Sequence, residues 1–345
     1  MKILIVGLGS IGQRHLCNLR CLFGDKLDIL AYRSIGRNMK ICDNMTAETD
    51  VDLESIYNIK TYLDYDQALE QRPDAVIIAN PTKLHVPAAL KAANRGCHLF
   101  IEKPISAGLE EVNKLERIVK EKELIVLVGY QLRFHSCLQT IKKLLDQKSI
   151  GELITVYSEF GEYLPNAHPY EDYRAGYAAR KDLGGGVLLS LSHEFDYLQW
   201  LFGMPVKLFA LGGKLSGLEM DVEDTGSILM ESTINGKSVA VHVHLDFRQN
   251  PASRTCCITG DKGKISWDYY SNRVILQVGE KKGWETFDFN PFERNNLFLE
   301  EMKYFINCVK TGKQTMVDIC EGTKSLRIAL ASKRSMQTGA VAEDI

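Results

Sequence analysis

The stretch "KILIVGLGSIG" (residues 2–12) decides the fold that we expect for this chain. Its first five residues are mostly apolar and predict a buried β-strand. Glycines follow with the spacing GxGxxG, and apolar residues at helical spacing continue to about residue 23. A strand, a GxGxxG loop and a helix in this order are typical of a dinucleotide-binding unit. The residues expected to surround the cofactor pyrophosphate are Gly7, Gly9, Ser10, Ile11 and Gly12.

The first part of the chain repeats an alternation of strand and helix patterns. Continuous apolar runs, typical of strands buried on both faces, lie at residues 27–32, 74–80, 97–102 and 124–130. Apolar residues at helical spacing separate several of them. We therefore expect residues 1–130 to form an α/β Rossmann domain, with a doubly wound parallel sheet that binds ligands at the carboxyl ends of its strands.

After about residue 150, strand patterns follow one another, at residues 153–160, 206–216, 226–234, 237–247, 253–260, 264–270 and 273–279. Asn235–Gly236, between two of these runs, is a hairpin turn signal. One helix is expected after the glycines at 184–186, and one or two over 295–337. Residues 131–345 are thus predicted to form an α+β domain for substrate binding and dimerisation, built on a large, open, mostly antiparallel sheet. We expect its C-terminal helix to pack back on the first domain.

Composition argues against several classes of function. The 345 residues carry a formal net charge of −2, so no nucleic-acid partner is expected. We expect no membrane association, because no apolar run approaches the roughly 20 residues that span a bilayer and the N-terminal run is too short for a signal peptide. The nine cysteines include no CxxC pair, which favours free thiols in a reducing cytoplasm. His242 and His244 share one strand face, but two ligands do not make a zinc site, and no metal is expected.

The end of the second strand bears on the choice of dinucleotide. An NAD site favours an acidic residue about 20 residues after the glycines, where it binds the ribose 2′-hydroxyl. This chain has "AYRSIGR" (residues 31–37) there and no acid. Arg33 and Ser34, with Arg37 beyond them, suit a 2′-phosphate because a guanidinium pairs well with phosphate oxygens. We therefore favour NADP(H) as the cofactor, with NAD(H) as the alternative.

Three further motifs give the chain a family resemblance. Together with the glycine loop, "NPTKLHVPAA" (80–89), "EKP" (102–104) and "GGGVLLSLSHEFDYLQWLFG" (184–203) resemble the Gfo/Idh/MocA oxidoreductases. The resemblance implies that Lys103 is catalytic, donates a hydrogen bond to a substrate hydroxyl and stabilises charge on its oxygen. For His85, a packing role at the start of a helix is an alternative to cofactor binding. The residues that the resemblance places around the nicotinamide ribose are Asn80, Thr82, His85, Glu102 and Lys103.

His193 is the candidate proton acceptor. Ser190, His193 and Asp196 are spaced i, i+3 and i+6, so one helix would display them as a stripe. A hydrolase triad is a poor interpretation, because such triads draw their residues from separate segments and need an oxyanion hole. We expect His193 to act as general base, Asp196 to orient its imidazole, and Ser190 and Asp196 to help bind substrate. Similar proteins often carry Asp one turn before this His, where this chain has Leu189 and Ser190.

The loop-rich stretch 161–186 is the candidate substrate site. It combines aromatic rings, which stack on sugars, with arginines, which bind carboxylate or phosphate. Tyr173 and Arg174 lie within it, and Tyr130 and Arg133 follow the last strand of the first domain. These four residues lead us to expect an acidic or nucleotide-linked sugar as the substrate. A solvated loop with incidental charges is the alternative.

The sequence therefore predicts an NAD(P)-dependent sugar dehydrogenase or ketoreductase, and the resemblance leaves two rivals open. One is a catalytically silent dinucleotide-binding regulator. The other is a glycosidase or epimerase that regenerates its own cofactor. In similar proteins the open face of the second sheet often forms a dimer interface, and the alternating run "SVAVHVHLDF" (238–247) fits such a face. A homodimer or homotetramer is expected.

Overall fold

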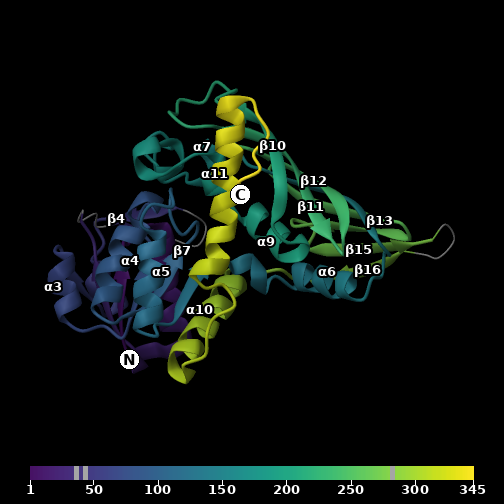
Figure 1. Ribbon diagram of the computed structural model, residues 1–345. Coiled ribbons are helices and arrows are strands. Elements are labelled where there is room, and N and C mark those ends of the chain that lie inside the picture. Colours follow the sequence, from purple (N-terminus) through teal and green to yellow (C-terminus); the bar gives the residue numbers. More distant parts are fainter. Residues whose placement is uncertain (35–38, 42–45, 280–283) are drawn as a thin grey trace.

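The computed structural model describes residues 1–34, 39–41, 46–279 and 284–345. In Figure 1 the N-terminal part, in purple and blue, forms one lobe, and the strands of the second half form a long twisted sheet that extends away from it. Helix α11 (Ile319–Thr338) stands along the junction between the two. The exact division into domains after residue 130 stays a proposal.

The first sheet is parallel throughout. Its strand order is β5-β2-β1-β6-β7-β8, and every neighbouring pair runs parallel. The chain proceeds from β1 to one side and then returns to place β6 on the other side, and open α/β sheets bind ligands at such a reversal. The predicted doubly wound sheet is confirmed. Its strands are β1 (Lys2–Val6), β2 (Asp28–Tyr32), β5 (Lys60–Tyr62), β6 (Ala75–Ile78), β7 (His98–Glu102) and β8 (Val126–Gly129).

Several short elements of this lobe were not predicted. They are β5, helix α2 (Leu53–Tyr57) and the paired strands β3 (Met39–Ile41) and β4 (Ala47–Thr49). The three residues of β5 are half-buried or exposed, so this strand lacks the continuous apolar run by which a buried strand is recognised. The remaining helices are α1 (Ser10–Phe23), α3 (Tyr65–Glu70), α4 (His85–Asn94) and α5 (Val112–Glu121), with 3₁₀ turns at Gly24–Lys26 and Thr82–Leu84.

The second sheet is the large, mostly antiparallel sheet that was predicted. Its order is β10-β11-β12-β9-β13-β14-β15-β16; β12 and β9 run parallel, and the other neighbours run antiparallel. Asn235 and Gly236 have φ values of 51° and 76°, as a type I′ hairpin turn requires. The last strand was not predicted. The strands are β9 (Leu153–Gly161), β10 (Pro205–Gly213), β11 (Thr225–Ile234), β12 (Lys237–Asp246), β13 (Ser253–Gly260), β14 (Gly263–Asp268), β15 (Arg273–Val278) and β16 (Glu285–Asp288).

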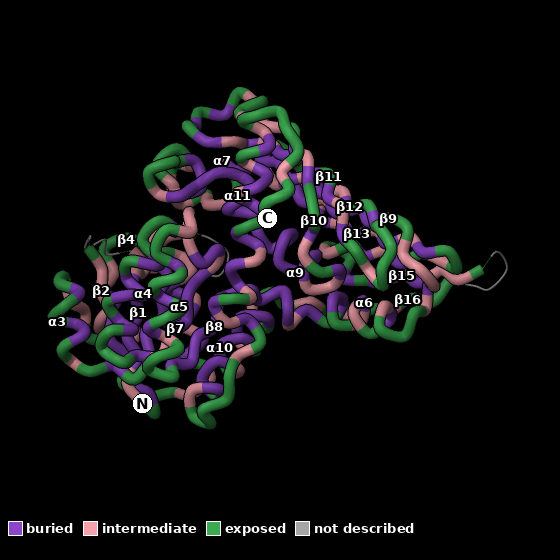
Figure 2. The backbone as a smooth tube through the Cα atoms, viewed as in Figure 1, coloured by how far each residue is buried: buried purple, intermediate pink, exposed green. Residues whose placement is uncertain are grey.

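The segment that follows the three glycines forms two helices rather than the single helix expected. Helix α8 (Val187–Ser190) ends at a two-residue turn, and α9 (His193–Phe202) begins after it. The expected single stripe of Ser190, His193 and Asp196 was therefore wrong, because the turn separates the first residue from the other two. Figure 2 shows α9 as buried between the sheet and the C-terminal helices.

The C-terminal helices join the two sheets. A Cβ atom built on Gly322 of α11 would lie 2.6 Å from Cγ2 of Val128 in β8, and the backbone N–H of Val128 donates to the oxygen of Val317 at 2.9 Å. None of the described helices is long and apolar enough to cross a bilayer. The other helices are α6 (Ser136–Asp146), α7 (Leu164–Ala167) and α10 (Arg294–Thr311), with 3₁₀ turns at Gln131–Phe134, Tyr177–Ala179 and Lys181–Leu183.

Candidate active site

Lys103 directly follows β7, at the carboxyl edge of the parallel sheet. Its ammonium group donates a hydrogen bond of 2.6 Å to the backbone oxygen of Ser190, at the end of α8. Its peptide bond to Pro104 is cis. Burial lowers the pKa of Lys103, against the opposing effect of the carboxylates of Glu102 and Glu162. One hydrogen bond thus joins the end of the parallel sheet to the helix that precedes His193.

Glu102 links Lys103 to the glycine-loop helix. Its Oε1 lies 2.6 Å from Nε2 of His15 on α1, and its Oε2 accepts a hydrogen bond of 3.1 Å from the backbone N–H of Lys103. Burial raises the pKa of Glu102, but the hydrogen bond from His15 and the charge of Lys103 outweigh it and leave the pKa below its usual range. Sequence reasoning missed His15. Its signal was the i, i+3, i+4 spacing of Gly12, His15 and Leu16 on the buried face of α1.

The glycine loop has the close approaches that a pyrophosphate cradle needs. A Cβ atom on Gly12 would lie 2.0 Å from the oxygen of Gly7, and Gly7 itself has a φ of +94°. A Cβ atom on Gly9 would meet no described atom within 4 Å, so the space beside this residue is open. Ser10 begins α1, whose first turn contains no acidic residue. These features fit a pyrophosphate group bound against the helix N-terminus.

His85 ties two loops of the parallel sheet together. Its Nε2 lies 2.8 Å from the backbone oxygen of Asn80, and its Nδ1 lies 2.9 Å from that of Pro104. Burial lowers the pKa of His85, against the effect of these two carbonyl groups. Because both ring nitrogens face the protein backbone, we revise the expected role of His85 from ribose contact to positioning of the loops. Thr82 lies buried beside it.

The end of β2, where a ribose 2′-phosphate would bind, has both a basic and an acidic side chain nearby. The backbone N–H of Arg33 donates to the oxygen of Tyr62 at 3.1 Å, and Ser34 is exposed. Asp52 lies near enough for the charge of Arg33 to help lower its pKa, although a hydrogen bond from Ser55 is the main cause. Arg37, the further basic residue of this loop, falls outside the described residues.

His193 begins α9 and packs against the first domain. Its ring meets that of Tyr130 edge to face, with centroids 5.6 Å apart. Nδ1 is buried and has no hydrogen-bond partner in residues 1–34, 39–41, 46–279 and 284–345. Burial lowers the pKa of His193 well below its usual value, and the positive charges of Lys103 and Arg254 lower it further. The imidazole is therefore neutral at pH 7 and able to accept a proton.

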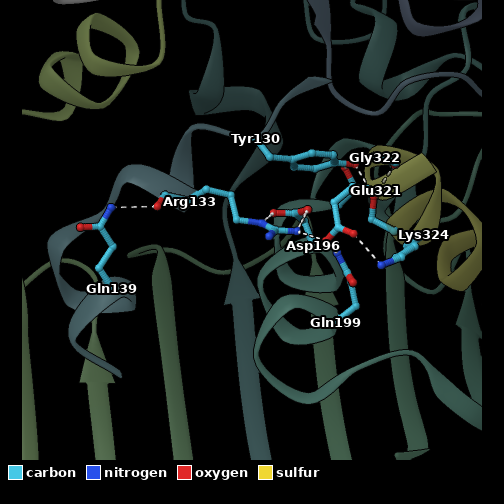
Figure 3. A network of polar contacts seen from close by, with 10 residues as sticks. Tyr130, Arg133, Gln139, Asp196, Gln199, Glu321, Gly322 and Lys324 are labelled. Carbon is cyan, nitrogen blue, oxygen red and sulfur yellow. Dashed lines mark hydrogen bonds and ion pairs between the residues drawn. The ribbon is translucent and has the colours of Figure 1, made fainter. Parts of the chain in front are cut away.

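Arg133 and Asp196 bind each other rather than a substrate. The guanidinium donates to both oxygens of the Asp196 carboxylate, at 2.7 and 2.8 Å, and to Glu321 of α11 at 2.9 Å. Figure 3 shows this network, in which Gln199 and Lys324 also donate to Glu321. We therefore correct both assignments: Asp196 does not orient His193, and the pair fastens α9 to the segment after β8 and to α11.

Three other side chains that were expected to contact substrate also bind other residues of the protein. The Tyr130 hydroxyl lies 2.5 Å from that of Ser325, and this tyrosine is 1% exposed. The Tyr173 hydroxyl accepts a hydrogen bond from the backbone N–H of Glu219 at 3.0 Å. Arg174 pairs with Asp172 and Glu219 on the surface. Arg174 of the stretch 161–186 is therefore paired with carboxylates of the protein, as expected for an arginine on a solvated loop.

A second buried ion pair lies beside His193. Arg254 of β13 donates to both oxygens of Glu194, at 2.7 and 3.0 Å, and its guanidinium lies 4.3 Å from the ring centroid of Phe160. Sequence reasoning missed this pair, because Glu194 and Arg254 are 60 residues apart. The only local signal was an acidic residue on the apolar face of the expected helix.

A cavity of about 440 Å³ also lies between the two lobes. Lys103 and His193 do not line it, so we do not identify it with the reaction site. Among the described residues, no group of three or more His, Cys, Asp or Glu side chains could hold a metal ion. The cavity is lined by Lys83, Val86, Pro87, Ser106, Ala107, Gly108, Glu110, Glu111, Lys181, Gly184, Gly185, Leu189, Val222 and Lys333.

Comparison with known proteins agrees with this arrangement. Residues 1–130 match the Gfo/Idh/MocA model described as an oxidoreductase family with an NAD-binding Rossmann fold, and residues 138–266 match the C-terminal domain of the same family. The myo-inositol 2-dehydrogenase of Thermotoga maritima is 25% identical, over 98% of this chain and 96% of that protein. The scyllo-inositol 2-dehydrogenase (NAD(+)) of Bacillus subtilis is 26% identical, over 98% and 95% of the two chains.

A solved structure shows the same fold. The WlbA dehydrogenase from Bordetella pertussis, in complex with NADH and UDP-GlcNAcA, has a TM-score of 0.79 and 21% identity, covering 99% of this chain and 98% of that chain. The two-part architecture of this chain thus agrees with that of a solved dehydrogenase. From these matches to both of its parts, we conclude that the chain belongs to the Gfo/Idh/MocA oxidoreductase family.

Proposed function

We propose that this protein is an NAD(P)-dependent dehydrogenase or ketoreductase that acts on a ring hydroxyl or ketone of a sugar or cyclic polyol. The observation that carries the proposal is the position of Lys103, which connects to α1 through Glu102 and His15 and to α8 through Ser190. A cofactor on the glycine loop and a substrate in front of α9 would both adjoin this lysine. The names of the inositol dehydrogenases that the chain resembles agree with such a substrate.

The side chains divide the chemistry between them. A nicotinamide cofactor bound at the carboxyl edge of the sheet would supply hydride transfer. Lys103 would leave the Ser190 oxygen and donate a hydrogen bond to the reacting oxygen of the substrate, stabilising its developing negative charge. His193, neutral at pH 7, would accept the hydroxyl proton during oxidation and return it during reduction. His85 would hold the two loops that flank the lysine.

We propose NADP(H) as the favoured cofactor and NAD(H) as the alternative. Arg33 and Ser34 support the phosphate, whereas the nearby Asp52 and the NAD(+) in the name of one relative support the alternative. Equilibrium titration of NADPH and NADH decides between them. If Arg33 binds the 2′-phosphate, Arg33→Ala will weaken NADPH binding by about 10- to 100-fold, as expected for a charged hydrogen bond, and will leave NADH unchanged. Equal losses for both cofactors would contradict NADP(H).

An acidic or nucleotide-linked sugar as the substrate stays a narrower proposal, and the ion pairs of the arginines reduce its support. Arg133 and Arg174 were its main basis, and both pair with carboxylates of the protein. Arg180 of the same stretch pairs with Asp182. A neutral sugar or polyol therefore fits the described side chains better.

We also propose a homodimer or homotetramer formed through the open face of the second sheet. Tyr157 of β9 stacks on His242 of β12, with ring centroids 4.4 Å apart, and the tyrosine is 54% exposed. Leu211 and Leu229 add exposed apolar area on neighbouring strands. Light scattering on wild type and Tyr157→Glu tests this proposal. A wild-type monomer would contradict it.

Because the described cysteines are free thiols, we propose a cytoplasmic location.

The experiment that tests the function is an absorbance assay of nicotinamide reduction or oxidation. Purified protein is mixed with each cofactor and a panel of inositols, neutral sugars, keto-sugars and sugar nucleotides. Substrate-dependent turnover establishes the dehydrogenase. Cofactor binding without turnover on any substrate would favour the silent regulator. Tightly bound cofactor together with isomerised or hydrolysed product would favour the self-recycling enzyme.

A further inference from the structure

Strand β9 runs alongside α9, the helix that begins at His193. The Ser158 hydroxyl lies 2.6 Å from that of Tyr197 on α9. Two residues further along β9, the Phe160 ring lies under Arg254, which is paired with Glu194. As the strand advances from residue 158 to 160, the helix residue that it reaches moves back by about one turn, from residue 197 to 194. Ser158 reaches the helix directly, and Phe160 reaches it through Arg254.

Glu162 continues this series. In extended chain it points to the same side as Ser158 and Phe160, because side chains alternate along a strand. Its backbone N–H donates to the oxygen of Asp246 at 3.1 Å, so the pairing with β12 extends past the end of β9. The next turn back along the helices is that of Ser190, whose backbone oxygen holds the ammonium group of Lys103. The Glu162 carboxyl group is thus near enough to the ammonium group of Lys103 for the two charges to act on each other.

The neighbours of Glu162 agree with this position. Burial raises the pKa of the Tyr177 phenol to about 12. The negative charges of Glu162 and Glu102 also raise this pKa, and a contact with Ser190 lowers it. Burial likewise raises the pKa of Glu162 itself, against the positive charges of Lys103, Arg254 and Arg294. Tyr177, Ser190, Lys103 and Glu162 thus form one cluster at the carboxyl edge of the parallel sheet.

Glu162 differs from the paired acidic residues around Lys103 because it is uncommitted. Its carboxyl group makes no hydrogen bond and no ion pair with the residues that the structure describes, whereas Glu102, Glu194 and Asp196 each have a basic partner. These pairs are Glu102 with His15, Glu194 with Arg254, and Asp196 with Arg133. Glu301 of α10 also lacks a partner among the described residues, but it is almost completely enclosed by the protein. An acceptor that is half-buried, close to the lysine and unpaired is suited to a donor supplied by a ligand.

We propose that Glu162 is a substrate-binding and specificity-determining residue, whose carboxylate accepts a hydrogen bond from a substrate hydroxyl next to the one held by Lys103. This inference rests on the dehydrogenase function proposed above. It narrows the substrate to a neutral sugar or polyol with neighbouring hydroxyl groups. A substrate carboxylate at this position would face a like charge and would be disfavoured.

Equilibrium binding tests the proposal without requiring turnover. Full-length protein is saturated with reduced nicotinamide cofactor, so that no hydride leaves a polyol, and is titrated calorimetrically with myo-inositol, D-glucose and D-glucuronate. The variants are Glu162→Gln and, as a matched control, Glu159→Gln. Glu159 lies on the opposite side of β9, where it accepts a hydrogen bond from Gln249 at 2.6 Å. Cofactor affinity and thermal midpoint verify that each variant is folded.

The wild type is expected to bind a neutral ligand at least about 10-fold more tightly than glucuronate. Glu162→Gln should weaken the neutral ligand by about 10- to 100-fold, the usual effect of losing a charged acceptor, and should reduce the discrimination against glucuronate. Glu159→Gln should behave as wild type. Ser190→Asp in the Glu162→Gln background should restore part of the neutral-ligand affinity, because it returns a carboxylate to the same cluster.

Three results would overturn the proposal: tighter wild-type binding of glucuronate, no wild-type binding of either neutral ligand, or Glu162→Gln affinities within about twofold of wild type. The dehydrogenase function is judged separately by the turnover assay. Turnover in the wild type with unaltered binding in Glu162→Gln would reject only the role of Glu162. Selective binding that depends on Glu162, without turnover on any panel substrate, would reject only the proposed reaction.

Discussion

At the scale of single residues, the side chains around Lys103 divide into those with partners inside the protein and those without. Local sequence patterns could identify Lys103 and His193, because the motifs that contain them are short and specific. They could not show that Arg133 is paired with Asp196, since 63 residues separate the two. Partners from distant segments meet only after folding, which is why substrate contacts were assigned to side chains that stabilise the protein itself.

His15 is expected to hold Glu102 in place, because the two form a buried pair at 2.6 Å. His15→Phe leaves the buried carboxylate of Glu102 without this partner, so unfolding free energy should fall by about 3–5 kcal/mol. Urea denaturation measures this value. Replacing both partners, as in His15→Phe with Glu102→Met, should recover part of the loss. A loss below about 1 kcal/mol in the single variant would show that the pair is unimportant.

Glu321 is expected to make stability depend on pH in the acid range. Burial raises its pKa, but hydrogen bonds from Lys324, Gln199 and Arg133 outweigh burial and hold the pKa at about 2, below the usual 4.5. The stabilisation is thus complete above pH 4.5 and is lost as pH falls towards 2. Glu321→Gln should therefore be less stable than wild type at pH 7 and closer to it at pH 3, as read from urea midpoints. The exposed Glu300→Gln serves as control, and a pH-independent difference for Glu321→Gln would contradict the assignment.

At the scale of elements, the sequence predicted most strands and the helical C-terminal region, because apolar periodicity is a local property. It did not predict the break between α8 and α9. The run "VLLSLSHEFDYLQW" (187–200) contains no proline or glycine to mark an end. The contact that accompanies the break comes from a distant segment: Lys103 donates a hydrogen bond to the backbone oxygen of Ser190, the last residue of α8.

Gly322 is expected to set how closely α11 approaches β8. An added methyl group would lie 2.6 Å from Cγ2 of Val128, and overpacking of this kind costs about 1–3 kcal/mol. Alanine gains only about 1 kcal/mol in helix propensity over glycine, so Gly322→Ala should be destabilised in thermal unfolding. Val128→Ala added to this variant should restore only part of the stability, because it removes Cγ2 but leaves the Cβ of residue 128 at 2.8 Å from the added methyl group. A stabilised Gly322→Ala single variant would show that the helix moves freely.

At the scale of the whole molecule, the fold class followed from patterns, while the site depends on how the two sheets meet. The parallel sheet supplies Lys103, Glu102 and the glycine loop, and the second sheet supplies Glu162 and Arg254 beside the helix of His193. Helix α11 connects them through Glu321 and Gly322. No sequence periodicity encodes the relative placement of two sheets, so the uncommitted carboxylate of Glu162 could be recognised only in the structure.

The central claim is that Lys103 lies between cofactor and substrate and supports hydride transfer. The most direct test compares Lys103→Met with wild type in the nicotinamide absorbance assay, with cofactor affinity measured in parallel and the exposed Lys83→Met as control. The account predicts that kcat/KM falls by about 100- to 1,000-fold in Lys103→Met, the usual effect of losing one donor to a reacting oxygen, while cofactor affinity and the control stay near wild type. Undiminished turnover in Lys103→Met would contradict it.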